Sequence, residues 1–70
     1  MSKFEAYKNV VAGYRVFYPE WRDGQAHFNV LTWVDVEASD EVFGTWRDPF
    51  DEDARIPALL LFLEERWKSS

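Results

Sequence analysis

Apolar side chains recur along the first eighteen residues at intervals of three and four positions, which places them on one stripe of a helix. The members of this stripe are Phe4, Tyr7, Val11, Tyr14 and Tyr18. Ser2 and Glu5 have the spacing of a capping box at its start. Pro19 follows its end, and a residue before proline avoids the α region. The pattern predicts a helix over about residues 3–18.

The next segment, residues 20–37, fits a β-hairpin in part. Apolar residues alternate with others from Ala26 to Val36, and Asp23-Gly24 suits the tight turn of a hairpin that pairs 14–21 with 25–36. Against this, Leu31 and Trp33 interrupt the polar phase of the alternation. Pro19 would also sit inside the first strand, where it removes a hydrogen-bond donor.

The same segment also fits a helix that begins at Asp23 as its N-cap. Its apolar face would then consist of Ala26, Val30, Trp33 and Val34. The pattern alone leaves both structures open: an all-α chain, or an α+β chain with a hairpin at about residues 14–36.

The second half of the chain predicts two further helices. A short one covers about residues 35–44, and Gly44 suits its end because only glycine enters the left-handed region freely. A loop follows over residues 45–53. The last helix is expected at about 55–67, with Asp53 as its cap. Its core face consists of Ile56, Leu59, Leu60, Leu63 and Trp67.

Length and composition restrict the kind of protein. The chain has 70 residues and is expected to form one helical domain over 1–70. It contains no cysteine and a single histidine, His27, which excludes disulfides and cysteine-based zinc sites. Thirteen aromatic side chains supply the bulk that a core of this size needs. Because cysteines are missing, we expect a reducing, cytoplasmic environment.

Charge is distributed unevenly along the chain. Residues 1–34 carry four basic and three acidic side chains, whereas residues 35–70 carry four basic and ten acidic ones. The resulting balance of +1 and −6 disfavours direct binding to nucleic acids, whose phosphates need cations. The longest apolar stretch, Ile56 to Leu63, has eight residues, far short of the ~20 that cross a membrane. The N-terminal residues also lack the apolar stretch of a secretory signal.

Four short motifs carry a resemblance. They are the run R-x-G-Q-A-x-F-N-x-L at Arg22 to Leu31, then Gly44-Thr45, Asp48-Pro49-Phe50, and I-P-A-x-L-x-F-L at Ile56 to Leu63. The chain resembles, over about residues 20–64, a group of short uncharacterised proteins that bacteriophages and some bacteria encode. The resemblance implies an all-helical fold, and with it we expect a small bundle of three to four helices.

A polar stripe is expected on the second helix. Arg22, Gln25 and Asn29 stand at positions i, i+3 and i+7 and therefore share a face. The stripe could bind a ligand or a peptide backbone. Alternatively, Gln25 and Asn29 hydrogen-bond the irregular backbone of residues 44–50 while Arg22 pairs with Asp48, because buried irregular backbone needs partners.

The sequence offers no convincing catalytic, cofactor-binding or metal-binding residues. The acidic run Asp48, Asp51, Glu52 and Asp53 lacks the glycine and the ligand alternation of a calcium loop. His27 has no cysteine to activate, and the serines lie near the termini or in an acidic stretch. We expect a protein without enzymatic activity or cofactors.

The last helix has more apolar residues than its core face requires. Leu61 and Phe62 are left over, and Glu65 lies one turn after Leu61. These three residues predict an interaction surface that a second copy or a partner protein covers. The predicted function is a small protein–protein interaction module, such as a phage accessory or host-modulating protein. The alternatives are an acidic mimic of DNA and, with least support, a small enzyme.

Overall fold

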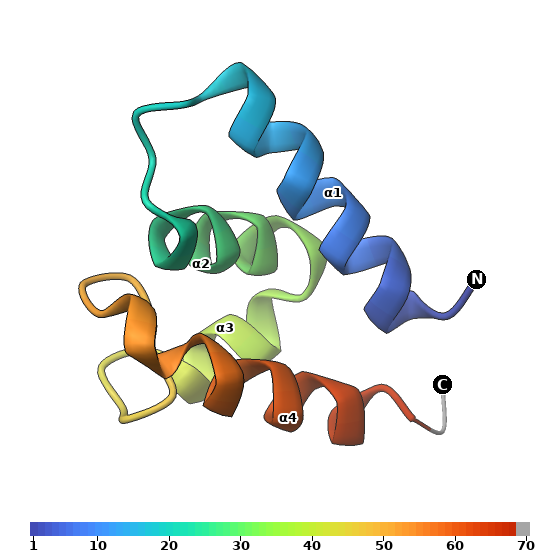
Figure 1. Cartoon of the computed structure of the whole chain (residues 1–70). Coiled ribbons are helices and arrows are strands. Elements are labelled where there is room, and N and C mark those ends of the chain that lie inside the picture. The colour runs from blue at the N-terminus through green and yellow to red at the C-terminus, as the bar shows by residue number, and fades with distance from the viewer. Residues whose placement is uncertain (69–70) are drawn as a thin grey trace.

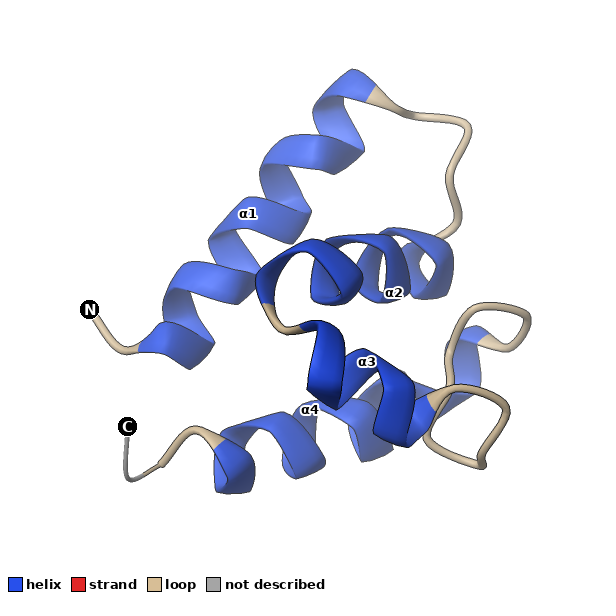
Figure 2. Ribbon diagram, turned by 180° about the vertical axis from the view of Figure 1, so that it is seen from behind, coloured by secondary structure: helices blue, strands red, loops and turns tan. Residues whose placement is uncertain are grey.

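The structure is a computed structural model that describes residues 1–68, and helices succeed one another along these residues (Figure 1). They are α1 (Lys3–Phe17), α2 (Asp23–Val34), α3 (Val36–Val42) and α4 (Ile56–Arg66), with a 3-10 turn, η1 (Asp53–Arg55), directly before α4. Between residues 1 and 68 no segment is a strand (Figure 2). The predicted all-α bundle is therefore confirmed, and the alternative hairpin at residues 14–36 is wrong.

Helix α2 lies in the middle of the bundle, between α1 on one side and α3 and α4 on the other (Figures 1 and 2). Ala26, Val30 and Leu31 are fully buried. Adjacent residues such as Val30 and Leu31 would face opposite sides of a strand. A helix that is covered from several directions buries both, which explains why the alternation in this segment was misleading.

The ends of the first two helices depend on local hydrogen bonds. Ser2 Oγ accepts the amide of Glu5 at 3.1 Å, as the capping-box spacing predicted. Helix α1 ends at Phe17, where the amide of Tyr18 donates to Tyr14. The N-cap of α2 is Arg22 rather than Asp23, which is the first residue of the helix. The predicted cap is therefore wrong, and the Asp23 carboxylate instead forms an ion pair with Arg15 of α1.

The start of α4 also differs from the prediction. Asp53 does not cap this helix; its carboxylate instead accepts the amide of Gly24, at 3.0 Å, at the N-terminus of α2. The 3-10 turn η1 leads into α4, and Pro57 occupies the first turn, where its missing N–H costs nothing. Gly44 follows α3 with a φ of +73°, which confirms the predicted left-handed position.

Gly24 allows the loop before η1 to approach the backbone of α2. A Cβ at this position would lie 1.9 Å from the carbonyl oxygen of Pro49 and 2.8 Å from the Asp53 carboxylate. Only glycine fits such an approach without displacing backbone. The contact fixes residues 44–53 against α2 and so fixes where α4 begins.

Helix α4 contributes one face to the core. Leu59 and Leu63 are fully buried, and Trp67 is nearly so, as the sequence predicted. The hydrophobic core also contains Tyr7 and Val11 of α1. The radius of gyration of 11.1 Å is close to the about 11 Å expected for a compact chain of this length.

Candidate functional site

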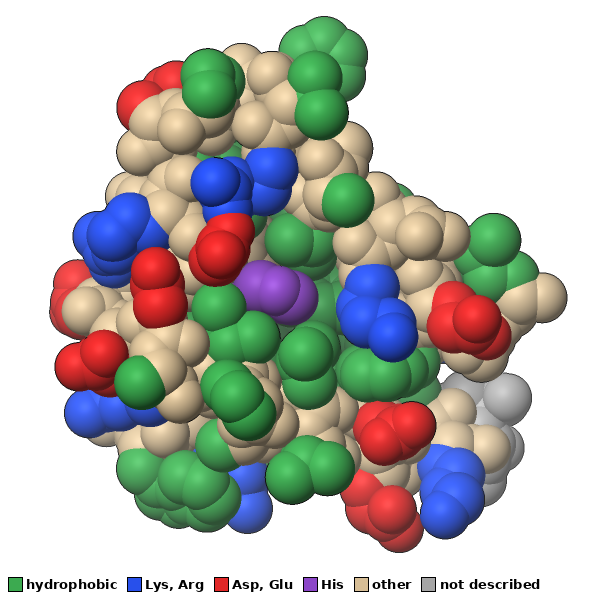
Figure 3. Space-filling model, in the orientation of Figure 1, with side chains coloured by type: hydrophobic (Ala, Val, Ile, Leu, Met, Phe, Trp, Pro, Cys, Tyr) green, Lys and Arg blue, Asp and Glu red, His purple; other side chains and the backbone are tan. Residues whose placement is uncertain are grey.

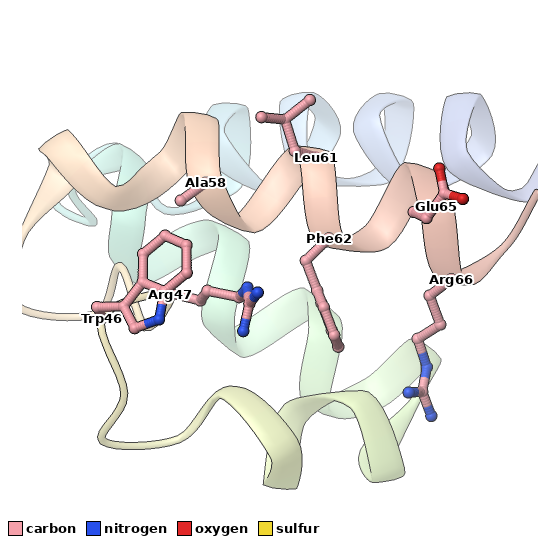
Figure 4. Close-up of a pocket in the computed structure, with 7 residues that line it drawn as sticks. All are labelled: Trp46, Arg47, Ala58, Leu61, Phe62, Glu65 and Arg66. Carbon is pink, nitrogen blue, oxygen red and sulfur yellow. The ribbon is translucent and has the colours of Figure 1, made fainter.

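A shallow groove of about 600 Å³ lies between α4 and the loop that follows α3 (Figure 4). Its lining consists of Trp46, Arg47, Ala58, Leu61, Phe62, Glu65 and Arg66. The three residues that the sequence singled out as an interaction surface, Leu61, Phe62 and Glu65, therefore line one feature. We call it the α4 groove.

The position of Leu61 follows from the burial of its neighbours. Leu59 and Leu63 face the core. Because a helix turns about 100° per residue, Leu61 points away from both of them. It is 70% exposed, and Figure 4 shows its side chain projecting outward from α4. Trp46, across the groove, is 62% exposed.

Phe62 differs from the prediction that treated it as surplus. Its ring is only partly exposed and packs against the hydrophobic core. Two guanidinium groups lie against this ring: Arg47 at 5.2 Å and Arg66 at 5.8 Å from its centroid. Phe62 therefore forms the floor of the α4 groove, and Leu61 forms its projecting rim.

The charges along the groove have different partners. Arg66 forms ion pairs with Asp35 and Glu41. Arg47 stacks on Trp46, 4.4 Å from the ring centroid, and within residues 1–68 no carboxylate pairs with it.

Glu65, at the other end of the groove, has a single ion-pair partner within the described chain. This is Lys68, 3.9 Å away, and both side chains are mostly exposed. Exposed pairs of this kind contribute little to stability. Arg47, which pairs with no carboxylate of the described residues, and Glu65, whose one pair is weak, can therefore both pair with an occupant.

The predicted polar stripe does not form one site. Arg22 donates to the carbonyl of Phe50 and pairs with Asp53 at 3.6 Å, so the predicted pair with Asp48 is wrong. Gln25 accepts the amide of Arg22 at 3.3 Å and caps its own helix instead of binding the loop.

Asn29, the remaining residue of the stripe, and Asp48, the predicted partner of Arg22, are also separate from each other. Asp48 is buried and accepts the amides of Gly44, at 2.8 Å, and Phe50, at 3.0 Å, so it organises the loop from within. Asn29 is partly buried, and its side chain forms no hydrogen bond within the described residues. The predicted contacts of the stripe are therefore wrong: Arg22, rather than Gln25 or Asn29, binds the backbone of the loop, and it pairs with Asp53 rather than Asp48.

Sequence reasoning missed a polar centre at Asp35. Its carboxylate accepts the Ala38 amide at 3.1 Å, the Trp67 indole N–H at 3.0 Å and Arg66 at 3.4 Å, and Lys3 lies 4.0 Å away. Burial alone would raise the pKa of Asp35. The bonds from Trp67 and Ala38, together with the charge of Arg66, outweigh that effect and lower its pKa below the ordinary value.

His27, the single histidine, is engaged by Tyr7. The Tyr7 hydroxyl donates to the His27 backbone carbonyl at 2.8 Å and lies 2.9 Å from Nδ1 of the ring. Because the Tyr7 hydroxyl donates its one proton to the carbonyl, the hydrogen of the second contact is the one on Nδ1 of His27. Burial raises the pKa of Tyr7, whereas burial and then the charge of Arg15 lower the pKa of His27.

The imidazole reaches the surface among hydrophobic side chains (Figure 3). Over residues 1–68, no group of three or more His, Asp or Glu side chains is arranged to hold a metal ion.

A second apolar surface lies at the C-terminal half of α1. A hollow of about 310 Å³ is lined by Val10, Gly13, Tyr14 and Phe17. Beside it, four aromatic rings of α1, α2 and their connection contact one another: Tyr14, Tyr18, Trp21 and Trp33. This surface has no charged residue in its lining, unlike the α4 groove.

Comparisons with known proteins add no relative. A scan against family models, a search of curated proteins and a search of solved structures each gave no match. As for membranes, none of the helices within residues 1–68 has the length and apolar character needed to cross one.

Proposed function

We propose that this chain is a small non-enzymatic protein–protein interaction module that docks through the α4 groove. The observation that carries the proposal is the exposure of Leu61, 70%, at the edge of a groove whose opposite side carries the exposed ring of Trp46. Covering a leucine fully is worth about 1.5–3 kcal/mol, so most of that free energy is still available to an occupant. Trp46 adds an exposed aromatic ring, a residue type that is enriched in the centres of interfaces.

The shape of the groove favours a protein over a small ligand. Pockets for small molecules enclose most of the ligand surface. Here Leu61 projects from the helix, and the groove between it and Trp46 is open (Figure 4). A projecting apolar side chain next to a shallow groove is suited to a second surface that has a pocket of its own.

The other two functions that the sequence left open have less support. An enzyme would need a general acid or base that can reach a substrate, yet the ring of His27 and the hydroxyl of Tyr7 are hydrogen-bonded to each other. A mimic of DNA would present unpaired carboxylates, whereas several acidic residues pair with arginine: Asp23, Asp35, Glu41 and Asp53. Resemblance to short phage proteins adds that the module acts in the cytoplasm, as an accessory or host-modulating protein.

The test compares Leu61→Glu with Val16→Glu. Val16 is 79% exposed on α1 and lies outside the groove, so its substitution is a matched control for adding a charge to a helix surface. Each protein is used for affinity capture from a lysate of the host organism and for sedimentation at several concentrations. Circular dichroism checks that both variants remain helical.

We expect Leu61→Glu to lose an association, with a captured protein or with a second copy, that the wild type and Val16→Glu keep. The proposal fails if Leu61→Glu keeps every association of the wild type, or if the wild type has none. Captured proteins that are released steeply by salt and are unaffected by Leu61→Glu would favour the DNA mimic instead.

A further inference from the structure

We infer that the occupant of the α4 groove is a second copy of this chain, bound through an antiparallel, two-fold contact between the two α4 helices. The inference rests on the proposed function and names the partner of the same site. It is carried by where the apolar and charged side chains lie along α4.

Leu61 is the central residue of α4, which spans Ile56–Arg66. A two-fold axis through Leu61, perpendicular to the helix, therefore lays one α4 antiparallel on another with complete overlap. The two Leu61 side chains meet at the axis. Each Leu61 side chain is then covered by the other.

The same axis brings opposite charges together. Glu65 lies four residues after Leu61, about 6 Å along the helix, and Ala58 lies three residues before it, about 4.5 Å. Antiparallel packing places Glu65 of one copy beside Ala58 of the other, and Ala58 lines the groove together with Arg47 (Figure 4). Glu65 of each copy then faces Arg47 of the other, and the pair occurs twice.

This pattern favours a second copy over an unrelated partner. The groove supplies both members of an ion pair. Arg47 lies against the rings of Trp46 and Phe62 and pairs with no carboxylate of the described residues, and Glu65 has only the exposed pair with Lys68. Arg66, the third charged lining residue, is already neutralised by Asp35 and Glu41. A surface that is complementary to itself under a two-fold rotation is the requirement for an isologous dimer.

The expected dimer is weak. Each copy carries a net charge of −5, so the copies repel each other at long range. The contact also extends along one helix of 11 residues, which offers less area than the about 800 Å² per partner of standard interfaces. We therefore expect a micromolar or weaker dissociation constant, in which apolar contacts give the affinity and the Glu65–Arg47 pairs give the register.

The decisive experiment is sedimentation equilibrium of Glu65→Arg and Glu64→Arg. Both residues are exposed on α4, but Glu64 lies outside the groove. Both substitutions reduce the net charge from −5 to −3, because each replaces −1 by +1, and should reduce general repulsion equally. We expect Glu64→Arg to dimerise at least as well as the wild type. Glu65→Arg should dimerise roughly tenfold or more weakly, because it sets like charges against each other.

A mixing experiment tests the pairing itself. Arg47→Glu alone should also be monomeric, since its new carboxylate faces Glu65 of the other copy. An equimolar mixture of Arg47→Glu and Glu65→Arg should recover dimers, because both cross-contacts then join opposite charges. Circular dichroism first verifies that each variant is folded. If Arg47→Glu loses helix, Arg47→Gln takes its place; it should also recover dimers on mixing, although less strongly.

The outcomes separate this inference from the proposed function. If the wild type stays monomeric to millimolar concentration while Leu61→Glu loses a captured protein, the inference that a second copy occupies the groove is wrong. The proposed function as an interaction module is then still supported. If the wild type dimerises but Glu65→Arg and Glu64→Arg behave alike, or mixing recovers nothing, the antiparallel pairing is wrong. If Leu61→Glu keeps every association, both proposals fail.

Discussion

Two glycines in helices should respond to alanine in opposite directions. At Gly24, the added Cβ would lie 1.9 Å from the Pro49 carbonyl oxygen, so the loop or α2 must move by more than 1 Å. Overpacking of this kind costs about 1–3 kcal/mol. The shift also weakens the bond from the Gly24 amide to the Asp53 carboxylate, 3.0 Å long, which belongs to a class worth about 1.5–3 kcal/mol.

The expected loss for Gly24→Ala is therefore about 2–4 kcal/mol, which corresponds to a fall in Tm of roughly 10–25 °C for a domain of this size. Gly13→Ala is the control. Gly13 lies inside α1 with no neighbouring atom within 4 Å of an added Cβ, so the substitution gains helix propensity alone. It should stabilise by about 0.5–1 kcal/mol.

Thermal and urea unfolding, followed by circular dichroism at 222 nm, measure both variants. A Gly24→Ala protein as stable as the wild type would refute the close approach of the loop to α2. The same result would also refute the position that we assign to the start of α4. A destabilised Gly13→Ala protein would show instead that the open face of α1 is covered.

Three further predictions concern buried and partly buried polar groups. Asp35→Ala should destabilise by about 2–4 kcal/mol in urea unfolding, because the α3 cap and the partner of the Trp67 indole are lost together; a loss under 0.5 kcal/mol would contradict this. Tyr7→Phe should lower the free energy of unfolding by about 1–3 kcal/mol, since it removes two hydrogen bonds to His27. An unchanged midpoint of urea unfolding would refute the contribution of these bonds. The pKa of His27 is lowered in the folded chain, so the unfolded chain binds the proton more readily, and the free energy of unfolding should fall as the pH drops below 6.5. His27→Gln should remove that dependence. A wild type that is equally stable at pH 7 and pH 5 would contradict the lowered pKa of His27.

Local signals in the sequence predicted the helices well. The stripe of α1, its Ser2 cap and the left-handed Gly44 after α3 each depend on residues within one or two turns of one another. Helix α2 was ambiguous because it is buried on several sides, so its apolar residues follow no single period. The choice of helix depended on packing partners that the pattern of one segment does not contain.

Partners that are distant in sequence could not be predicted in the same way. Arg22 could reach either Asp48 or Asp53, and the sequence does not say which one the folded loop presents. The Asp35 centre depends on Trp67, 32 positions away, although the cap at Asp35 has a recognisable local spacing.

The predicted interaction surface could be found only in part from the sequence. Leu61 follows from counting which apolar residues the core cannot accept. Arg47 and Trp46, which complete the α4 groove, come from a loop whose path the sequence did not indicate.

The central claim is that association occurs through the α4 groove. Amide spectra of ¹⁵N-labelled protein, recorded from low micromolar to millimolar concentration, test it most directly. We predict concentration-dependent shifts at Trp46 and Arg47 and along α4 from Ala58 to Arg66, which Leu61→Glu abolishes. Spectra that do not change with concentration or with added partner, or shifts confined to the hollow around Tyr14 and Phe17 of α1, would contradict the account.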